Sequence, residues 1–177
     1  ASASASFQVV DTEGPSIFTQ AQNRIVECSD TNTNAAAVQT WLNENGGASA
    51  SDTCYNSNFV WSNTFTTLNF DGCESFADVT FRATDPCGQF STTTARFTIT
   101  DNTPPSITQV ASTQIFECDD ATNPTEISSY VSSRGGAEAI DSCSLVRWSN
   151  DFTEGPTECG PSVSVSFTAT DACGNTA

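Results

Sequence analysis

The sequence predicts an all-β protein built from two tandem β-sandwich domains, each with one short helix between its early strands. One reason is that the chain of 177 residues repeats itself once, with a unit of about 90 residues, the size of a small sandwich domain. The other is that apolar and polar residues alternate, as in strands with one exposed face. The matched positions are Pro15 and Pro105, Cys28 and Cys118, Gly46 and Gly135, Cys54 and Cys143, Trp61 and Trp148, Cys73 and Cys159, and Cys87 and Cys173.

Each repeat is expected to begin with two short strands and a helix. The segments GPSIFTQ and PPSITQV open the first strand, and the alternating NRIVEC and TQIFEC form the second. In the second repeat Asn123 is a candidate N-cap, Pro124 suits the first helical position and Glu126 completes a capping box. Gly46 and Gly135 are expected to end the two helices. The apolar stripes that would face the core are Val38, Trp41 and Leu42, and then Ile127, Tyr130 and Val131.

Two further strands are expected in both repeats. CYNSNFVWSN and CSLVRWSND carry Trp61 and Trp148, and DVTFRATD and VSVSFTATD alternate strictly. The first repeat then continues through TTTARFTITD, whereas the second has only NTA after Gly174. The missing strand is found at the other end of the chain, because ASASASFQVVD aligns with STTTARFTITD and Phe7 aligns with Phe97.

This alignment determines the expected domain organisation. Residues 1–11 form a donor-type strand that completes another domain, residues 12–101 form the first domain, and residues 102–177 form the second, which lacks its last strand. The Pro104–Pro105 pair restricts the linker between them. An unpaired sheet edge of this kind invites strand addition. The residues expected at the interface are Phe7, Val9 and Val10 on the donor strand, and Phe167 and Ala169 on the acceptor.

The composition excludes several classes of function. There are 21 acidic residues against 5 arginines and the net charge is −16, which excludes a nucleic-acid binder because phosphate contacts need cations. No apolar stretch is long enough to span a membrane. We expect no catalytic activity, because the chain has no histidine or lysine to act as a base. Carboxylate pairs such as Asp119 and Asp120 could support glycoside hydrolysis, but adjacent acids in a loop are more typical of calcium ligands or solvated turns.

The eight cysteines fall into two sets of four, and disulfides are expected rather than zinc, because the chain has no histidine and no paired CxxC. Disulfides indicate an oxidising compartment and therefore a secreted or cell-surface protein. Each set of four allows three pairings. Antiparallel neighbouring strands would join Cys54 to Cys87 and Cys143 to Cys173. The pairs Cys28–Cys73 and Cys118–Cys159 follow only by elimination.

Acidic residues gather near one end of each repeat and in the linkers, which indicates a calcium site, because Ca²⁺ takes about six to eight oxygen ligands. The alternative is that aspartates simply populate solvated turns. The segment DNTPP after the alternating strand resembles the junction ligands of cadherin modules. The candidate ligands are Asp11, Glu13, Asp85, Asp101, Asn102, Glu117, Asp119, Asp120 and Asp171.

Several motifs resemble a known family of repeats. FRATDPCG, FTATDACGNTA, FTITDNTPPSI and FQVVDTEGPSI are similar to hyalin-repeat-type immunoglobulin-like modules. The four-cysteine pattern VEC…DTC…GC…DPCG resembles tandem modules of large bacterial surface adhesins, including gliding-motility adhesins. The resemblance covers nearly the whole chain and implies immunoglobulin-like β-sandwiches that act as extracellular stalk or adhesion units. The sequence departs from the vertebrate form, which has a Cys-Pro near its first strand, so no disulfide pairing is carried over.

Three functions from different classes remain. We expect a structural subunit of an extracellular filament, which polymerises head-to-tail when the N-terminal strand of one copy enters the second domain of the next. The alternative is a pair of stalk or binding modules cut from a long cell-surface adhesin that binds carbohydrate or surfaces. The third is an accessory domain of a secreted enzyme. The expected partner is a second copy of the chain in the first case and a surface glycan in the second.

Overall fold

The computed structural model describes residues 2–71, 73–118, 123–155, 160 and 162–177. By its internal contacts the chain divides into two units, each described here by itself. Unit 1 comprises Ala1–Val26 and Thr31–Thr100, and unit 2 comprises Glu27–Asp30 and Asp101–Ala177. The segment Glu27–Asp30 therefore belongs to unit 2, although it lies within the first sequence repeat. No helix among the described residues is long and apolar enough to cross a membrane.

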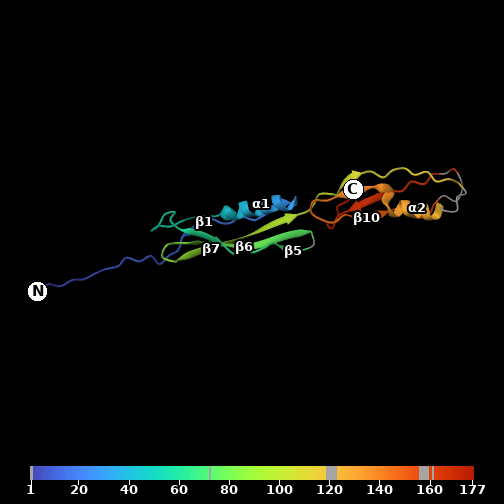
Figure 1. Ribbon diagram of the computed structural model, residues 1–177. Helices are drawn as coiled ribbons and strands as arrows, with labels where there is room; N and C mark the ends of the chain where they lie inside the picture. The colour runs from blue at the N-terminus through green and yellow to red at the C-terminus, as the bar shows by residue number, and fades with distance from the viewer. Residues whose placement is uncertain (1, 72, 119–122, 156–159, 161) are drawn as a thin grey trace. The chain divides into compact units, whose positions relative to one another are not determined.

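Unit 1 combines a five-stranded sheet, a two-stranded sheet and a helix (Figure 1). Its elements are β1 (Ser16–Thr19), β2 (Arg24–Glu27), α1 (Thr31–Asn43), β3 (Ser49–Ser51), β4 (Val60–Asn63), β5 (Asn69–Asp71), β6 (Glu74–Thr84) and β7 (Phe90–Thr100). The strands of the larger sheet follow the order β2-β7-β6-β4, and β5 also pairs with β6. β1 pairs with β3 in the smaller sheet, where the register shifts between Ile17 and Thr19.

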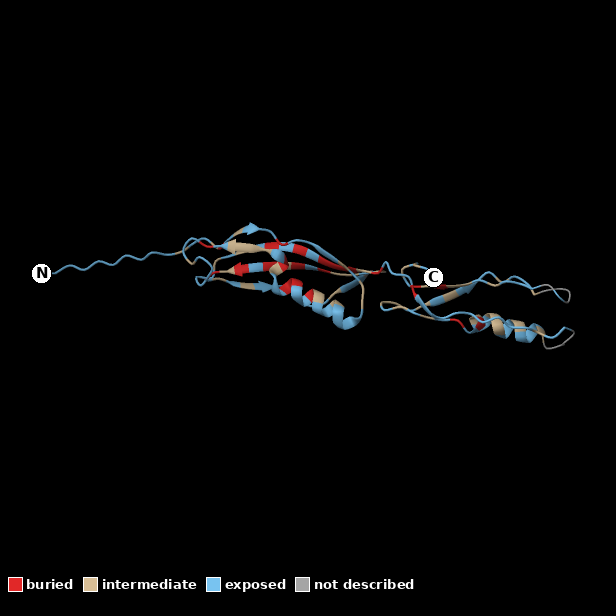
Figure 2. Cartoon of the chain, turned by 90° about the horizontal axis from the view of Figure 1, so that it is seen from above, coloured by how far each residue is buried: buried red, intermediate tan, exposed pale blue. Residues whose placement is uncertain are grey.

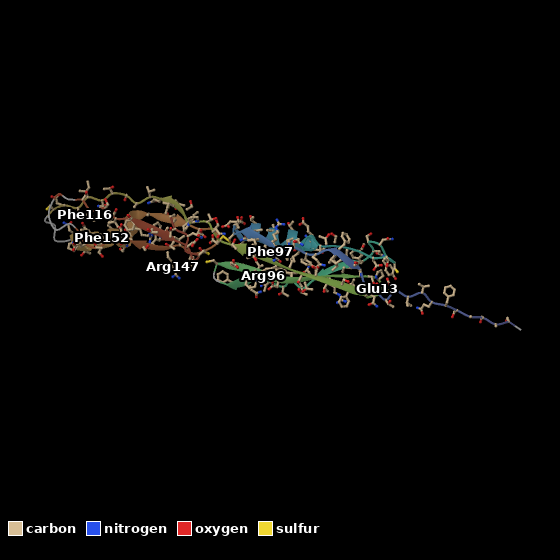
Figure 3. All side chains as sticks on the ribbon, turned by 180° about the vertical axis from the view of Figure 1, so that it is seen from behind. Glu13, Arg96, Phe97, Phe116, Arg147 and Phe152 are labelled. Carbon is tan, nitrogen blue, oxygen red and sulfur yellow. A yellow bond between two sulfur atoms is a disulfide. The ribbon has the colours of Figure 1, made fainter. Side chains whose placement is uncertain are left out.

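The core of unit 1 lies between β6, β7 and α1. Alternate residues of β6 and β7 are buried, and Phe81 and Phe97 are 0% exposed. The ring of Trp41 on α1 lies 5.1 Å from that of Phe81 and 5.3 Å from that of Phe97, measured between centroids. Aromatic pairs at such distances stabilise a core beyond their burial alone. Figure 2 shows the buried residues as red bands on these elements. Arg96, next to Phe97 on β7, lies on the other face and forms an ion pair with Asp78 at 2.7 Å (Figure 3).

Unit 2 repeats the register of unit 1 in shorter strands. Its elements are β8 (Ser106–Gln109), α2 (Asn123–Ser132), β9 (Glu138–Ile140), β10 (Arg147–Asn150) and β11 (Phe167–Thr170). β8 pairs with β9, and β10 pairs with β11. Trp148 lies opposite Ala169, as Trp61 lies opposite Ala83 in unit 1. The largely β fold, with one α-helix in each unit, agrees with the predicted β class, whereas the two immunoglobulin-like sandwiches stay a prediction.

Both α-helices are followed by a short 3-10 turn that contains the predicted glycine. Gly46 and Gly135 have φ of 65° and 60°, a region that side chains rarely adopt. A Cβ atom at Gly46 would also lie 2.9 Å from the ring of Phe81. The predicted cap of α2 differs, because the Nδ2 of Asn123 donates to the Glu117 carbonyl at 2.6 Å. The buried Oδ1 of Asn123 has no hydrogen-bond partner among the described residues, so the expected capping bond is not made.

Candidate functional site

The first candidate site is the outer edge of β11 in unit 2. One side of β11 pairs with β10 over its four residues. On the other side, the described residues contribute an isolated bridge from Thr170 to Thr176 and two backbone hydrogen bonds between Ala169 and Ala177, of 2.9 and 3.0 Å. In unit 1 the corresponding side of β6 pairs with β7 over the whole of Phe90–Thr100. Among the described residues, the pairing on this side of β11 is therefore limited to Ala169 and Thr170.

This edge leaves apolar side chains of unit 2 uncovered. Val163 is 46% exposed, whereas its counterpart on β6 is 4% exposed. Phe167 and Tyr130 are half-buried, with ring centroids 6.1 Å apart, while their counterparts in unit 1, Phe81 and Trp41, are buried. Ala169 is buried, but α2 has no buried residue at all, in contrast to the three on α1 (Figure 2). Among the described residues of unit 2, the side chains that match the core of unit 1 are thus less buried than their counterparts.

The N-terminal segment has the sequence of a strand but not its structure. Residues 2–10 belong to no strand or helix, and Figure 1 shows them as an extended thread. Phe7 and Val9 are 94% and 88% exposed, and Val10 is exposed as well. The counterparts of Phe7 and Val9 on β7 are buried. The two predicted halves of the interface lie in different units, since this segment belongs to unit 1 and Phe167 and Ala169 belong to unit 2.

The second candidate site is a disulfide in unit 2. Cys28 and Cys143 are joined, with a Cα–Cα distance of 6.1 Å. This bond contradicts the predicted pairs Cys28–Cys73 and Cys143–Cys173, because each of them loses one cysteine to it. The prediction kept Cys28 within the first domain. The structure instead assigns the segment Glu27–Asp30 to unit 2, and this assignment brings Cys28 to Cys143.

The predicted Cys54–Cys87 bond is not formed, since both cysteines are free and exposed. The hydroxyl of Tyr55 lies 2.9 Å from the Sγ of Cys87. This hydrogen bond, aided by burial and nearby negative charge, raises the pKa of Tyr55 to about 12. The negative charge of Asp11 is the main reason that the pKa of the Cys54 thiol is raised. Cys54 therefore stays protonated at neutral pH and is a weak nucleophile.

Unit 2 holds a cluster of three carboxylates from separate segments. Asp101 follows β7, Asp141 follows β9 and Asp171 follows β11. Asp101 offers carboxylate oxygens within 4.8 Å of those of Asp141 and of Asp171. Burial raises the pKa of Asp101, and the negative charges of the other two add to this rise. Burial acts in the same direction on Asp171, but hydrogen bonds from the side chain and backbone of Asn175 outweigh it and lower the pKa.

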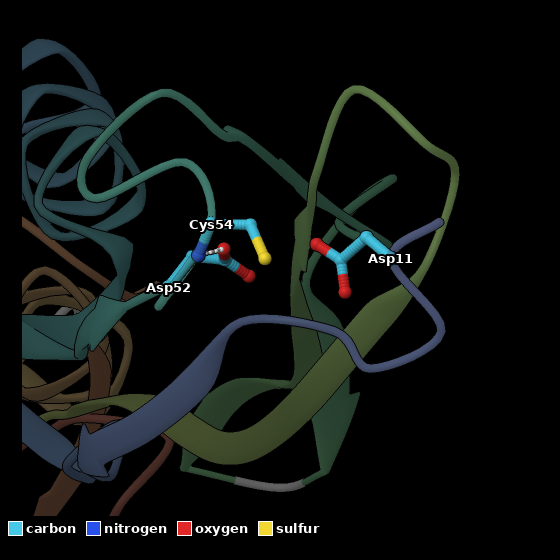
Figure 4. Close-up of side chains that lie close together, drawn as sticks. All are labelled: Asp11, Asp52 and Cys54. Atoms are coloured by element: carbon cyan, nitrogen blue, oxygen red, sulfur yellow. Dashed lines mark hydrogen bonds between the residues drawn. The ribbon is translucent and has the colours of Figure 1, made fainter. Parts of the chain in front are cut away.

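Unit 1 holds a related group that contains Asp11 and Asp52, whereas Asp85, the counterpart of Asp171, is not part of it. Asp11, Asp52 and Cys54 offer ligand atoms within 4.8 Å of one another, and Figure 4 shows the first two carboxylates facing each other. The Oδ1 of Asp52 accepts hydrogen bonds from the backbone N–H groups of Cys54 and Tyr55, at 2.7 and 2.8 Å. Asp52 was not among the predicted ligands. The Asp-x-Cys pattern shared by DTC and DSC in the two repeats is the signal that could have indicated it.

The other predicted calcium ligands lie outside both clusters. Glu13 is exposed, and its N–H donates to the Oδ1 of Asp11 at 3.2 Å. Asn102 donates from its N and Nδ2 to the carboxylate of Glu27, at 2.7 and 2.9 Å. These bonds lower the pKa of Glu27. Glu117 is exposed and belongs to neither cluster.

Some predictions fall on residues that the structure does not describe. Asp119 and Asp120 lie outside the described residues, and so does Cys159. Cys118, its predicted partner, is disulfide-bonded. The Cys118–Cys159 pair therefore stays a prediction.

No protein-family model matches the chain, and no curated protein sequence matches it. The resemblance to hyalin-repeat modules therefore stays a prediction from motifs, and function is argued from geometry.

Asp101 and Asp171 should affect the pH dependence of stability with opposite signs. Asp101→Asn should raise the free energy of unfolding at neutral pH, because ionised Asp101 is penalised in the fold. This gain should fade as the pH falls through the raised pKa towards the unfolded value of about 3.9. Asp171→Asn should lower stability at neutral pH, and the loss should fade as the pH falls from that unfolded value through the lowered pKa.

Urea denaturation of both variants and the wild type, with a metal chelator present, measures these differences from neutral pH to about pH 3. Subtracting the wild-type free energy of unfolding from that of each variant, at each pH, cancels the contributions of all other titrating groups. A shift of the same sign for both variants would contradict the assigned environments.

Proposed function

We propose that the protein is a structural subunit of an extracellular filament built from immunoglobulin-like modules. In this filament residues 1–11 of one copy form the last strand of unit 2 in the neighbouring copy. Unit 2 is the acceptor and the N-terminal segment is the donor. Because these are different surfaces, the contact is head-to-tail and continues from copy to copy.

One comparison within the chain carries this proposal. In unit 1, β7 covers the core, and its Phe97 and Ile99 are buried. Unit 2 has the same register through β10 and β11, but the described residues beside β11 stop at Ala177. The sequence that matches β7 is that of residues 1–11, where Phe7 and Val9 are exposed. The described chain thus contains an exposed segment, residues 2–10, that has the sequence of a strand. It also contains a partly exposed core in unit 2, and the matching core of unit 1 is completed by β7.

The pairing of β6 with β7 indicates how the donated strand would lie. Ala77 pairs with Phe97 in unit 1. Through the repeat, Phe7 of the donor would lie opposite Val163 of the acceptor, which is 46% exposed. Backbone hydrogen bonds along the strand would supply affinity, and alternating side chains would fix the register.

Two features support a place outside the cell. The Cys28–Cys143 disulfide is typical of oxidising compartments. The net charge of −16 resists non-specific association between copies, so that assembly depends on a specific contact. In a longer array of such modules the same groove would take its strand from a neighbouring module, so a test must separate strand binding from assembly.

A synthetic peptide of residues 1–11 should bind unit 2 and inhibit filament growth. In excess it would occupy the edge of β11 before the N-terminal strand of another copy arrives. Anisotropy of the labelled peptide measures binding, and sedimentation velocity with electron microscopy measures polymer length. The peptide should bind at one site per chain.

A peptide with Phe7→Asp and Val9→Asp is the matched control and should neither bind nor inhibit. Filaments that keep growing while unit 2 is saturated with peptide would contradict strand donation. Peptide binding by a chain that itself never assembles would support the groove but favour modules of a longer array.

A further inference from the structure

A pocket lies on the solvent-facing side of β6 and β7 in unit 1. Its volume is about 570 Å³, within the range of about 300–1,000 Å³ that is typical of small-molecule sites. Val79 and Ala95 line it, but their side chains are buried, so that their backbone forms its floor. The other side chains that line it are all polar, and they belong to Asn23, Asp78, Thr80, Thr94 and Arg96.

An ion pair in this pocket is held in one orientation (Figure 3). The Nε and Nη2 of Arg96 donate to the two carboxylate oxygens of Asp78, at 2.8 and 2.7 Å. The guanidinium also lies over the ring of Phe76, with 4.5 Å between the Cζ of Arg96 and the ring centroid. Because both contacts already restrict the two side chains, little conformational entropy is lost when a ligand binds to them.

Several hydrogen-bonding groups of the pocket are not used by the described part of the chain. The Nη1 of Arg96 donates to none of the described residues, and each oxygen of Asp78 accepts one bond although it could accept two. The Oδ1 of Asn23 accepts from the backbone N of Arg96 at 2.8 Å, which leaves its Nδ2 to donate to a ligand. Thr80 and Thr94 lie opposite each other on β6 and β7, and their hydroxyls can both donate and accept.

The matching positions of unit 2 lack these charged and amide groups. The counterparts of Asp78, Thr80 and Asn23 are Ser164, Ser166 and Thr113. The local backbone is nevertheless alike, because the N–H of Ser166 donates to the side chain of Asp151 as the N–H of Thr80 donates to that of Thr64.

Stability does not account for the ion pair either. The side chains of Asp78 and Arg96 are 64% and 49% exposed, and exposed ion pairs contribute little to the free energy of folding. A segment of the same register forms in unit 2 without such a pair. The charged groups of the pocket therefore point to a ligand rather than to the fold.

Charge and hydrogen bonding define the class of this ligand. The charges of Asp78 and Arg96 cancel, and the net charge of −16 repels anionic polymers. An apolar ligand would leave the polar groups of the pocket without partners, which is unfavourable. Adjacent hydroxyls of a sugar ring, in contrast, can donate to a carboxylate and accept from a guanidinium at the same time.

We propose that the pocket binds a neutral oligosaccharide. Asp78 accepts from one hydroxyl of a sugar ring and Arg96 donates to the next, while the Nδ2 of Asn23 and the hydroxyls of Thr80 and Thr94 bind the remaining ones. The inference does not rest on the filament, because every residue of the pocket belongs to unit 1. In the proposed filament the site would recur in every copy, so that weak single contacts would add up to firm attachment.

Saturation-transfer difference NMR with the full chain tests the proposal, because it observes the ligand whether or not the chain assembles. The probes are neutral trisaccharides of glucose, mannose, galactose and N-acetylglucosamine, and the acidic trisaccharide of galacturonic acid. At least one neutral probe should bind, and the acidic one should not. The Asp78→Ser/Arg96→Ser variant keeps the net charge but loses the hydrogen bonds of two side chains, so it should bind that neutral probe about tenfold or more weakly.

The matched control is Arg82→Thr, which introduces the residue that unit 2 has at this position. Arg82 lies on the same side of β6 but does not line the pocket, and its Cζ lies 3.7 Å from the ring centroid of Phe90. The control should therefore keep the affinity of the wild type. Urea denaturation checks that each variant is folded. If the double serine variant is not, Thr80→Val/Thr94→Val removes two hydroxyls with little change of shape and should still weaken binding.

Four results would overturn the site. The first is that no neutral probe binds, and the second is that the double serine variant, or the double valine variant used in its place, binds like the wild type. The third is that Arg82→Thr weakens binding as much as the double variant. The fourth is that only the acidic probe binds and Arg82→Thr abolishes its binding, because the arginine on this face would then recognise an anion.

Discussion

A chain with Phe7→Asp and Val9→Asp should fail to assemble head-to-tail while keeping the full stability of unit 1. Both side chains are almost completely exposed in unit 1, so their replacement removes no contact there. In the proposed filament they enter the core of the neighbouring unit 2, where burial of two such side chains contributes about 3–6 kcal/mol. Aspartate at these positions would instead place two carboxylates in an apolar groove, which is strongly unfavourable. Sedimentation velocity measures assembly, and urea denaturation measures stability.

The matched control is Phe97→Ala, at the counterpart of Phe7 on β7. Phe97 is 0% exposed and contacts the ring of Trp41, so its truncation should cost unit 1 about 3–5 kcal/mol. Comparison of positions 97 and 7 thus distinguishes two roles of a strand. A side chain at position 97 stabilises its own unit, whereas one at position 7 contributes to assembly with the next copy. The proposal fails if the double aspartate variant assembles like the wild type. It fails equally if that variant loses as much stability as Phe97→Ala.

The internal repeat made much of the fold predictable. Alternation identified β6 and β7, and the aligned residues Trp61 and Trp148 occupy matching positions, each opposite an alanine on the neighbouring strand. The glycines at positions 46 and 135 were predicted from their place after an apolar stripe, and both have the positive φ that favours glycine. These features are local, so sequence spacing alone specifies them.

The path of the chain between units could not be predicted in this way. The pattern of β2 shows that a strand ends near Cys28, but it does not show which unit the next residues join. The structure assigns Glu27–Asp30 to unit 2, and the disulfide pairing changes with it. The apolar stripe of α2 was predicted correctly as a pattern, yet no residue of α2 is buried. A sequence pattern indicates which face of a helix is apolar. That face becomes buried only where a neighbouring strand packs over it.

The candidate site was predictable only in part. Asp11, Asp101 and Asp171 were identified from their clustering in sequence, and each lies in a group of carboxylates, whereas Asp85 lies in none of these groups. Asn175 donates from its side chain to Asp171, whereas Gln89 at the matching position of unit 1 donates to Asp85 from its backbone N–H. Such a difference depends on distances between atoms, which composition and spacing do not contain.

Removal of the Cys28–Cys143 disulfide should lower the free energy of unfolding by about 2–5 kcal/mol. The bond closes a loop with a sequence separation of 115, which lies at the long end of the range where chain entropy gives a large effect. The Cys28→Ser/Cys143→Ser variant removes both partners of the bond, so that neither is left as a new unpaired cysteine. Urea denaturation of this variant, compared with the wild type, measures the loss.

The matched control is the Cys54→Ser/Cys87→Ser variant, measured with a chelator present so that metal binding does not contribute. Both cysteines are free and exposed, so this variant should change stability by no more than about 0.5 kcal/mol. Non-reducing peptide mapping supplies an independent readout and should recover Cys28 linked to Cys143. If mapping instead joins Cys54 to Cys87 and Cys143 to Cys173, and the control loses several kcal/mol, the pairing inferred from antiparallel strands is right. Cys143 would then not be available to Cys28, and the assignment of Glu27–Asp30 to unit 2 would lose its covalent support.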